Sequence, residues 1–250
     1  MPASKEKTAI IIPARYASTR LPGKPLIKID GKSIIQWVYE KASQSKSADE
    51  VIVATDDERI FEEVKSFGGK VKMTSSCHES GSDRIAEIVK ENPEIEIIVN
   101  VQGDEPLITP ESIDEAINAL MGDKNADIAT LIREITDKEE ILNPNTVKVV
   151  TDNAGKALYF SRSPVPYERT PGHTKFYAHI GLYAYRRESL LKMTELPQTN
   201  LEKAESLEQL RALQNGMTIK TVVVDYKPIG IDTPEDVEEF KRYIKSKLNS

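Results

Sequence analysis

Strand-like and helix-like segments alternate along the first half of the chain. Residues 8–14 form an almost continuous apolar run, TAIIIPA, and further runs follow at 50–55, 70–73 and 95–101. Each run is followed by a stretch whose apolar residues recur at helical spacing. Strands that are apolar on both faces are typical of a parallel sheet, whose neighbouring strands are joined by helices. The pattern predicts an α/β fold with a doubly wound, mostly parallel sheet of the Rossmann type.

The second half of the chain has a different pattern. Residues 147–151 and 156–161 flank the turn Asp152-Asn153-Ala154-Gly155, which is typical of a β-hairpin. No repeat or flexible linker separates the halves. We therefore expect one domain over residues 1–250, with an antiparallel hairpin lobe inserted at about 145–190. The elements predicted after the hairpin are a strand around 179–185, a helix over 206–213, a strand over 219–224 and a last helix opening at Thr233-Pro234.

Composition excludes several classes of protein. The chain has 34 Lys and Arg residues against 40 Asp and Glu, so its formal net charge is −6. A nucleic-acid binder usually carries a basic face, so we expect no nucleic-acid partner. The single cysteine, Cys77, excludes an internal disulfide framework and a multi-cysteine metal site. No apolar stretch approaches the ~20 residues of a membrane-spanning helix and no signal peptide is visible, so a cytoplasmic location is expected.

A basic loop follows the first predicted strand. Arg15, Arg20 and Lys24 lie within ten residues, in the sequence PARYASTRLPGKP. In open α/β sheets ligands bind beyond the carboxyl ends of the strands. Clustered cations at such a place suit a polyphosphate, because arginine offers fork-shaped donors and lysine a point charge. The loop is neither a Walker A motif nor a dinucleotide-binding GxGxxG motif, which disfavours ATPases and dehydrogenases.

Two acids occupy positions where a metal ion could be held. Asp104 follows the strand at 95–101, in VQGDEP, and Asp232 precedes the last helix, in GIDTPED. An acid at a strand end opposite a polyphosphate is well placed to bind Mg²⁺. Gly-Asp is equally ordinary turn chemistry, and an acid before a helix is unremarkable alone. From the residues alone both interpretations stay open.

Seven segments together resemble the 3-deoxy-D-manno-octulosonate (Kdo) cytidylyltransferase family. The resemblance covers most of the chain in the family's order and is most specific in the basic loop. It implies a nucleotide-diphospho-sugar transferase-like fold and the reaction of CTP with Kdo to give CMP-Kdo and pyrophosphate, for lipopolysaccharide biosynthesis. The segments are PARYASTRLPGKPL, VQGDEP, NPNTVKVV, ALYFSRSPVPY, HIGLYAYR, LEQLR and IDTPED.

The resemblance also implies roles for individual residues. The residues matching the CTP site are Arg15, Arg20, Lys24, Ser80, Gly81 and Arg84. Those matching the sugar-acid site are Gln102, Arg162, His179, Tyr183, Glu208 and Gln209, with Arg162 facing the Kdo carboxylate. Asp104 and Asp232 match Mg²⁺ ligands, and with Arg15 and Lys24 they form the expected catalytic set. Where the family has Thr-Glu, this chain has Ser82-Asp83, which keeps the hydroxyl and the acid.

The family resemblance leaves other assignments open. A homodimer is implied, with the hairpin lobe as its interface. The acceptor could be Kdo, a modified Kdo or another sugar acid. A binding protein without turnover is disfavoured by the intact Asp104 and Asp232 pair. A GT-A glycosyltransferase is disfavoured because VQGDEP lacks an Asp-x-Asp signature. No side chain stands out as a general base.

Overall fold

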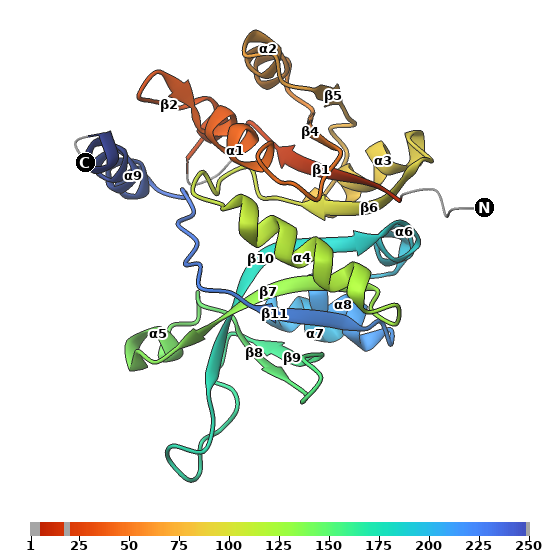
Figure 1. Cartoon of the computed structure of the whole chain (residues 1–250), viewed down its shortest axis with the longest axis vertical. Helices are drawn as coiled ribbons and strands as arrows, with labels where there is room; N and C mark the ends of the chain where they lie inside the picture. The colour runs from red at the N-terminus through yellow and green to blue at the C-terminus, as the bar shows by residue number, and fades with distance from the viewer. Residues whose placement is uncertain (1–5, 18–20, 249–250) are drawn as a thin grey trace. The chain divides into compact units, whose positions relative to one another are not determined.

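The computed structural model describes residues 6–17 and 21–248 (Figure 1). This part of the chain forms two compact units. The first contains the described residues up to Asp114 and from Pro228 onward, and the second contains Glu115–Lys227. The helix α4 (Pro110–Gly122) crosses from the first unit into the second. The second unit is thus an insertion in the sequence of the first.

The first unit contains a parallel sheet with the strand order β6-β1-β4-β5. Its strands are β1 (Lys7–Ala14), β4 (Glu50–Thr55), β5 (Val71–Met73) and β6 (Ile95–Asn100). From β1 the chain proceeds outward to β4 and β5, and then returns to place β6 on the other side of β1. The strand order therefore reverses between β1 and β6, which makes this point a topological switch point, where ligands of doubly wound sheets bind.

Capping side chains set where the helices of the first unit begin. Ser33 accepts a hydrogen bond from the Gln36 amide, and Asp57 does the same for Arg59. Ser80 and Asp83 form a reciprocal capping box. The elements between the strands are η1 (Lys24–Leu26), β2 (Lys28–Ile29), β3 (Lys32–Ser33), α1 (Ile34–Ala42), α2 (Glu58–Ser66) and α3 (Gly81–Glu91).

The last helix, α9 (Pro234–Leu248), belongs to the first unit. Phe240 is fully buried and meets the Trp37 ring edge-on, with 5.9 Å between ring centroids. Ile231, just before the helix, is also fully buried and lies in the same apolar cluster as Ile34. This packing fixes the chain around Asp232 against the first part of the sequence.

The second unit is built around β7 (Ile128–Ile135), which pairs parallel to β11 (Ile219–Val223) and antiparallel to β10 (Phe176–Arg186). The predicted hairpin is formed by β8 (Lys148–Thr151) and β9 (Ala157–Ser161), and β8 also pairs with β10. The inserted antiparallel hairpin is therefore confirmed. Its helices are α5 (Lys138–Leu142), α6 (Arg187–Glu195), α7 (Asn200–Glu205) and α8 (Gln209–Gln214).

One predicted helix is wrong in its first part. The sequence pattern predicts a single helix over residues 206–213, but Ser206 has φ of +51° and ends α7. The next helix begins only at Gln209, so the segment is a corner between two short helices. No helix within residues 6–17 and 21–248 has the length and apolar character needed to cross a membrane.

Candidate active site

A pocket of about 440 Å³ lies at the switch point of the first unit. It is formed by the loops that leave the carboxyl ends of β1 and β6, together with the start of α3 and the segment before α9. The side chains that the sequence predicts to bind phosphate and metal meet here. The pocket residues among those predicted are Arg15, Lys24, Gly81, Gln102, Asp104 and Asp232.

Lys24 lies between the two acids of this pocket. Its Nζ is 2.6 Å from Oδ2 of Asp104 and 3.0 Å from Oδ1 of Asp232. The lysine side chain is only 12% exposed, against 32% and 41% for the two aspartates. Burial lowers the pKa of Lys24, but the two aspartates outweigh it and raise the pKa above its ordinary value. The ammonium group is therefore charged at neutral pH.

The position of the Lys24 ammonium group indicates whether Asp104 and Asp232 could bind a divalent cation. One carboxylate oxygen from each acid reaches the same small cation, so both side chains converge on a single point. Oxygen donors of two carboxylates, supplemented by phosphate oxygens, are what Mg²⁺ prefers. The donor set therefore fits Mg²⁺, provided that Lys24 moves away to a phosphate group.

Hydrogen bonds to the backbone fix the positions of Asp104 and Asp232 relative to each other. The Ile231 amide donates to the Asp104 carbonyl at 2.9 Å, which ties the two segments together. Asp236 accepts from the amides of Asp232 and Thr233, both at 2.8 Å. The Thr233 hydroxyl accepts in turn from the Asp236 amide, so the start of α9 is capped while Asp232 points to Lys24. The position of Asp232 thus depends on the packing of α9.

Among the described residues that line this pocket, positive and negative side chains are equal in number. Arg15 and Lys24 oppose Asp104 and Asp232. Burial, together with the Asp104 charge, raises the pKa of Glu105 to about 8, so this neighbour is mostly uncharged at neutral pH. A bound polyphosphate would therefore bring negative charge that requires an added cation for compensation.

Gly103, in the loop after β6, lies against the carboxyl end of β1. A Cβ at this position would stand 2.9 Å from the Pro13 carbonyl oxygen. That distance is shorter than real Cβ contacts, and the atom it meets is backbone that cannot swing away. The loop after β6 can approach the carboxyl end of β1 this closely only because residue 103 has no side chain.

We predict that Gly103→Ala lowers kcat by about 10²-fold, because the Asp104 carboxylate must shift away from Lys24. The overpacking is expected to cost about 1–3 kcal/mol of unfolding free energy. Thermal unfolding and steady-state rates measure both effects. Gly122→Ala is the matched control, since its Cβ would meet nothing within 4 Å. Equal kcat and equal thermal stability of Gly103→Ala and Gly122→Ala would contradict the close approach of Gly103 to Pro13.

Arg15 connects the basic loop after β1 to the segment before α3. Its Nη1 donates to the Glu79 carbonyl at 3.0 Å, while its buried Nη2 has no hydrogen-bond partner among the described residues. Gly81 also lies against Pro13, since a Cβ added to it would stand 3.2 Å from the proline ring. The buried donor on Arg15 is free to take a phosphate oxygen. Arg20 lies outside the described residues.

Arg84 is placed differently from the other predicted nucleotide contacts. It is fully buried, and its guanidinium contacts Asp56 at 2.9 Å and the Thr74 hydroxyl. These partners follow β4 and precede α3, so Arg84 ties the ends of two strands to that helix. A contact between Arg84 and the nucleotide remains a prediction. In the structure, the guanidinium contacts of Arg84 support the first unit from inside.

The predicted sugar-acid residues other than Gln102 lie in the second unit. His179 Nε2 is 3.0 Å from the Thr130 hydroxyl, and its ring centroid is 5.3 Å from that of Tyr183. Burial lowers the pKa of His179 to about 3, so its ring is neutral at physiological pH. Burial, and then the negative charge of Glu208, raise the pKa of Tyr183. These three side chains form one cluster, with the buried Gln209 next to Glu208.

Arg162 is held by the backbone of its own unit. Its Nε donates to the Glu205 carbonyl at 2.7 Å, Nη1 to the Pro144 carbonyl at 3.0 Å and Nη2 to the Ser206 carbonyl at 3.4 Å. Sequence reasoning missed these partners, and it also missed Lys148, Gly103 and Asp236. Two of them had a signal in the sequence: Lys148 is a charged residue inside an apolar strand segment (VKVV), and Asp236 belongs to the helix-start pattern Thr233-Pro234-Glu235-Asp236.

A parallel sheet with a switch point, a basic loop and two convergent carboxylates together define a nucleotide-binding α/β enzyme of the nucleotidyltransferase class. A family model described as cytidylyltransferase matches residues 9–219. The 3-deoxy-manno-octulosonate cytidylyltransferase of Thermodesulfovibrio yellowstonii is 52% identical over 244 residues, covering 92% of this chain and 95% of that protein. The corresponding protein of Solibacter usitatus is 49% identical, covering 95% and 94%. The chain belongs to the 3-deoxy-manno-octulosonate cytidylyltransferase family.

A solved structure agrees with this assignment. The structure of CMP:2-keto-3-deoxy-manno-octonic acid synthetase complexed with CTP has a TM-score of 0.93 and 45% identity, covering 96% of this chain and 99% of that one. The predicted α/β fold with a mostly parallel sheet is confirmed by this likeness.

Proposed function

We propose that this chain catalyses the reaction of CTP with Kdo to give CMP-Kdo and pyrophosphate, the activation step that supplies Kdo for lipopolysaccharide biosynthesis. The observation that carries the proposal is the position of Lys24, between Asp104 and Asp232 at the switch point. This arrangement offers a polyphosphate one ammonium cation and one pair of carboxylates that suits a metal ion. Arg15 adds an unused buried donor on the same side.

The chemistry follows from charge. The acceptor hydroxyl must approach an α-phosphate that carries negative charge, and such transfers depend on positioning and electrostatic stabilisation. Arg15 and Lys24 bind phosphate oxygens and compensate the charge that develops on the leaving pyrophosphate. Asp104 and Asp232 would hold Mg²⁺. When bound there, the ion neutralises phosphate charge and favours ionisation of a nearby hydroxyl.

The acceptor would be recognised by the residues of the second unit. The neutral ring of His179 and the hydroxyl of Tyr183 can donate to or accept from sugar hydroxyls, and the Arg162 guanidinium suits a carboxylate. Glu208 and Gln209 complete the proposed set in this unit, while Gln102, also proposed for the acceptor, lines the pocket of the first unit. The buried Gln209 Nε2 has no hydrogen-bond partner among the described residues, which leaves a donor for a ligand.

Pyrophosphate release tests the reaction. With CTP and Mg²⁺ we expect release on adding Kdo, and little release with sialic acid or without a sugar. Chelation of the metal by EDTA should abolish release, and added Mg²⁺ should restore it. Release that persists in excess EDTA would contradict the metal assignment. A folded protein that binds CTP but never releases pyrophosphate with Kdo would overturn the reaction.

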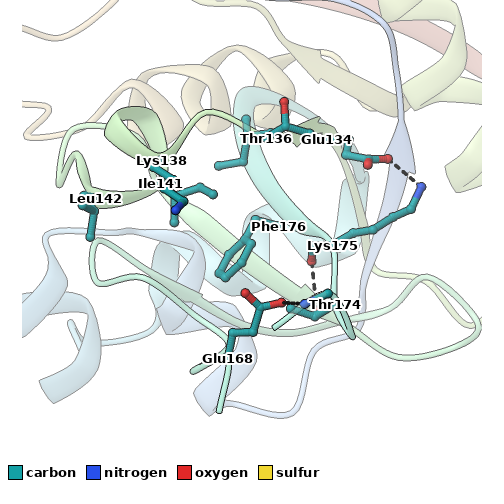
Figure 2. A pocket seen from close by; sticks show the side chains of 11 residues that line it. Glu134, Thr136, Lys138, Ile141, Leu142, Glu168, Thr174, Lys175 and Phe176 are labelled. Atoms are coloured by element: carbon teal, nitrogen blue, oxygen red, sulfur yellow. Dashed lines mark hydrogen bonds and ion pairs between the residues drawn. The ribbon is translucent and has the colours of Figure 1, made fainter. Parts of the chain in front are cut away.

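We also propose that the chain works as a homodimer through the second unit. A mostly apolar pocket of about 430 Å³ lies beside α5 and the start of β10, with Phe176 central among its labelled side chains (Figure 2). Leu142 on its rim is 66% exposed, and Tyr167 in the neighbouring loop is 88% exposed. An apolar pocket beside a protruding aromatic side chain can complement its own copy across a two-fold axis.

We predict that Leu142→Asp converts this dimer to a monomer, because a carboxylate at the pocket rim cannot be buried without a partner. Sedimentation equilibrium measures the mass of each variant. Leu158→Asp is the matched control, since Leu158 is 61% exposed on β9 but does not line the pocket. A wild-type protein of single-chain mass, or equal dissociation in both variants, would contradict this interface.

A cytoplasmic location is the last part of the proposal. CTP is a cytoplasmic nucleotide, and the proposed reaction consumes it. Fractionation of cells that produce the protein should recover pyrophosphate-releasing activity with the cytoplasmic marker enzymes, and recovery with the membrane fraction would contradict the location.

A further inference from the structure

Lys148 is a fully buried lysine in β8 that the proposed chemistry does not use. Its Nζ donates to three backbone carbonyls, those of Asn143 at 2.8 Å, Thr146 at 2.5 Å and Arg162 at 2.6 Å. An ammonium group has three N–H donors, so all of them are used. The buried side chain thus ties the loop before β8 to the chain that follows β9.

Arg162 is the residue whose position these hydrogen bonds constrain most. Its carbonyl accepts from Lys148, and its amide donates to the Glu205 carboxylate at 2.9 Å. Its guanidinium donates to the Pro144 carbonyl, which lies in the loop that Lys148 also holds. Lys148 therefore fixes both the backbone of Arg162 and one of the acceptors that orient its head group.

The guanidinium retains donors in this arrangement. Arginine has five N–H groups, and the three contacts to carbonyls use one on each nitrogen. One N–H on each terminal nitrogen is left, which is what a carboxylate takes in a bidentate pair. Burial lowers the pKa of Lys148, but its three carbonyl acceptors suit the ammonium form. With Arg162 beside it and Glu205 as the neighbouring acid, this cluster holds more basic than acidic groups, which favours an anion.

We propose that Lys148 is a positioning residue for the acceptor: it fixes Arg162 so that the remaining guanidinium donors meet the carboxylate of the sugar acid. The inference rests on the proposed function of Arg162 as the carboxylate-binding residue. It goes further by assigning the orientation of that arginine to a buried lysine that never touches the substrate.

The test compares Kdo with its carboxamide analogue, which lacks the negative charge. The measured quantity is the ratio of kcat/KM for the two acceptors. Lys148→Met keeps the length of the side chain and removes its donors. We expect it to reduce this ratio about 10-fold or more, with the KM for CTP unchanged, because a misplaced guanidinium no longer distinguishes the two. Lys156→Met, on the partly exposed turn of the same hairpin, should leave the ratio unchanged.

The variant Arg162→Met distinguishes an error in the proposed role of Arg162 from an error in the proposed role of Lys148. If Arg162→Met leaves the ratio unchanged, the proposed role of Arg162 is wrong. If Arg162→Met reduces the ratio and a folded Lys148→Met does not, only the positioning role of Lys148 is wrong. A purely structural role for Lys148 would lower the melting temperature and both kcat/KM values in parallel, which would also overturn the inference.

A measurement on the wild-type protein covers the case in which Lys148→Met does not fold. With ¹⁵N-labelled arginine, the Nε–H signal of Arg162 should show the order of a rigid side chain before any Kdo is added. Addition of Kdo should then shift the terminal N–H signals and leave the order of Nε–H unchanged. A mobile Arg162 side chain that becomes ordered only with Kdo would overturn the positioning role.

Discussion

Replacement of Asp104 by asparagine is expected to lower kcat by about 10²- to 10³-fold, the size of loss seen when a key electrostatic contact is removed. The amide keeps the shape of the carboxylate but loses the charge that, with Asp232, would hold the proposed metal ion. Pyrophosphate release measures the rate, and Mn²⁺ electron paramagnetic resonance in the presence of CTP measures metal binding. The rate of pyrophosphate release and the affinity for Mn²⁺ should both decrease.

Glu96→Gln provides the matched control for this variant. Glu96 is an exposed acid on β6, the strand that leads into the Asp104 loop, and it does not line the pocket. Its removal changes the net charge by the same amount without touching the site. Unchanged turnover in Asp104→Asn, or equal loss in both variants, would contradict the role of Asp104.

Lys24→Met should reduce kcat/KM for CTP about 10²-fold or more, through the loss of the proposed phosphate contact. The same change should have an opposite effect on metal binding in the absence of nucleotide. In the free protein the ammonium group occupies the point where Asp104 and Asp232 converge, so its removal leaves two carboxylates for a cation. Nucleotide-free Lys24→Met should therefore bind Mn²⁺ more tightly than the wild type.

Calorimetric titration with Mn²⁺ alone and with CTP alone measures the two effects separately. Lys28→Met is the control, because Lys28 is 61% exposed, lies in the same segment and pairs with Glu63 at 3.7 Å rather than with an acid of the pocket. Weaker Mn²⁺ binding in nucleotide-free Lys24→Met would show that the lysine does not compete with the metal ion.

Local sequence patterns predict the first unit well because its strands are buried on both faces. The strand at 50–55 has the predicted bounds, and β1 differs from its prediction by one residue. The strand β7 is not predicted. Arg133 and Glu134 interrupt its apolar residues, and periodicity alone does not distinguish such a segment from a helix. The predicted helix over 206–213 begins at Ser206, whose left-handed conformation no local pattern requires, and the observed helix begins only at Gln209.

The functional residues also divide into those that the sequence can predict and those that it cannot. Lys24 and Asp104 can be predicted as neighbours because both follow buried strands of one sheet, whose carboxyl ends lie at one edge. The partners of Arg162 cannot be predicted, since they are backbone carbonyls of residues up to 44 positions away. Nothing in a residue's type marks its carbonyl as an acceptor. Only the folded chain shows that Lys148 and Arg162 share one set of contacts.

The return of the last helix to the first unit has a consequence for synthesis of the enzyme. Lys24 and Asp232 are 208 positions apart, and α9 packs on residues near the beginning of the chain. During synthesis, Asp232 joins Lys24 only after the whole second unit has been made, because that unit lies between them in the sequence. A fragment that stops before Asp232 lacks one acid of the pair, and we expect it to bind Mn²⁺ more weakly in the presence of CTP than a chain that contains both.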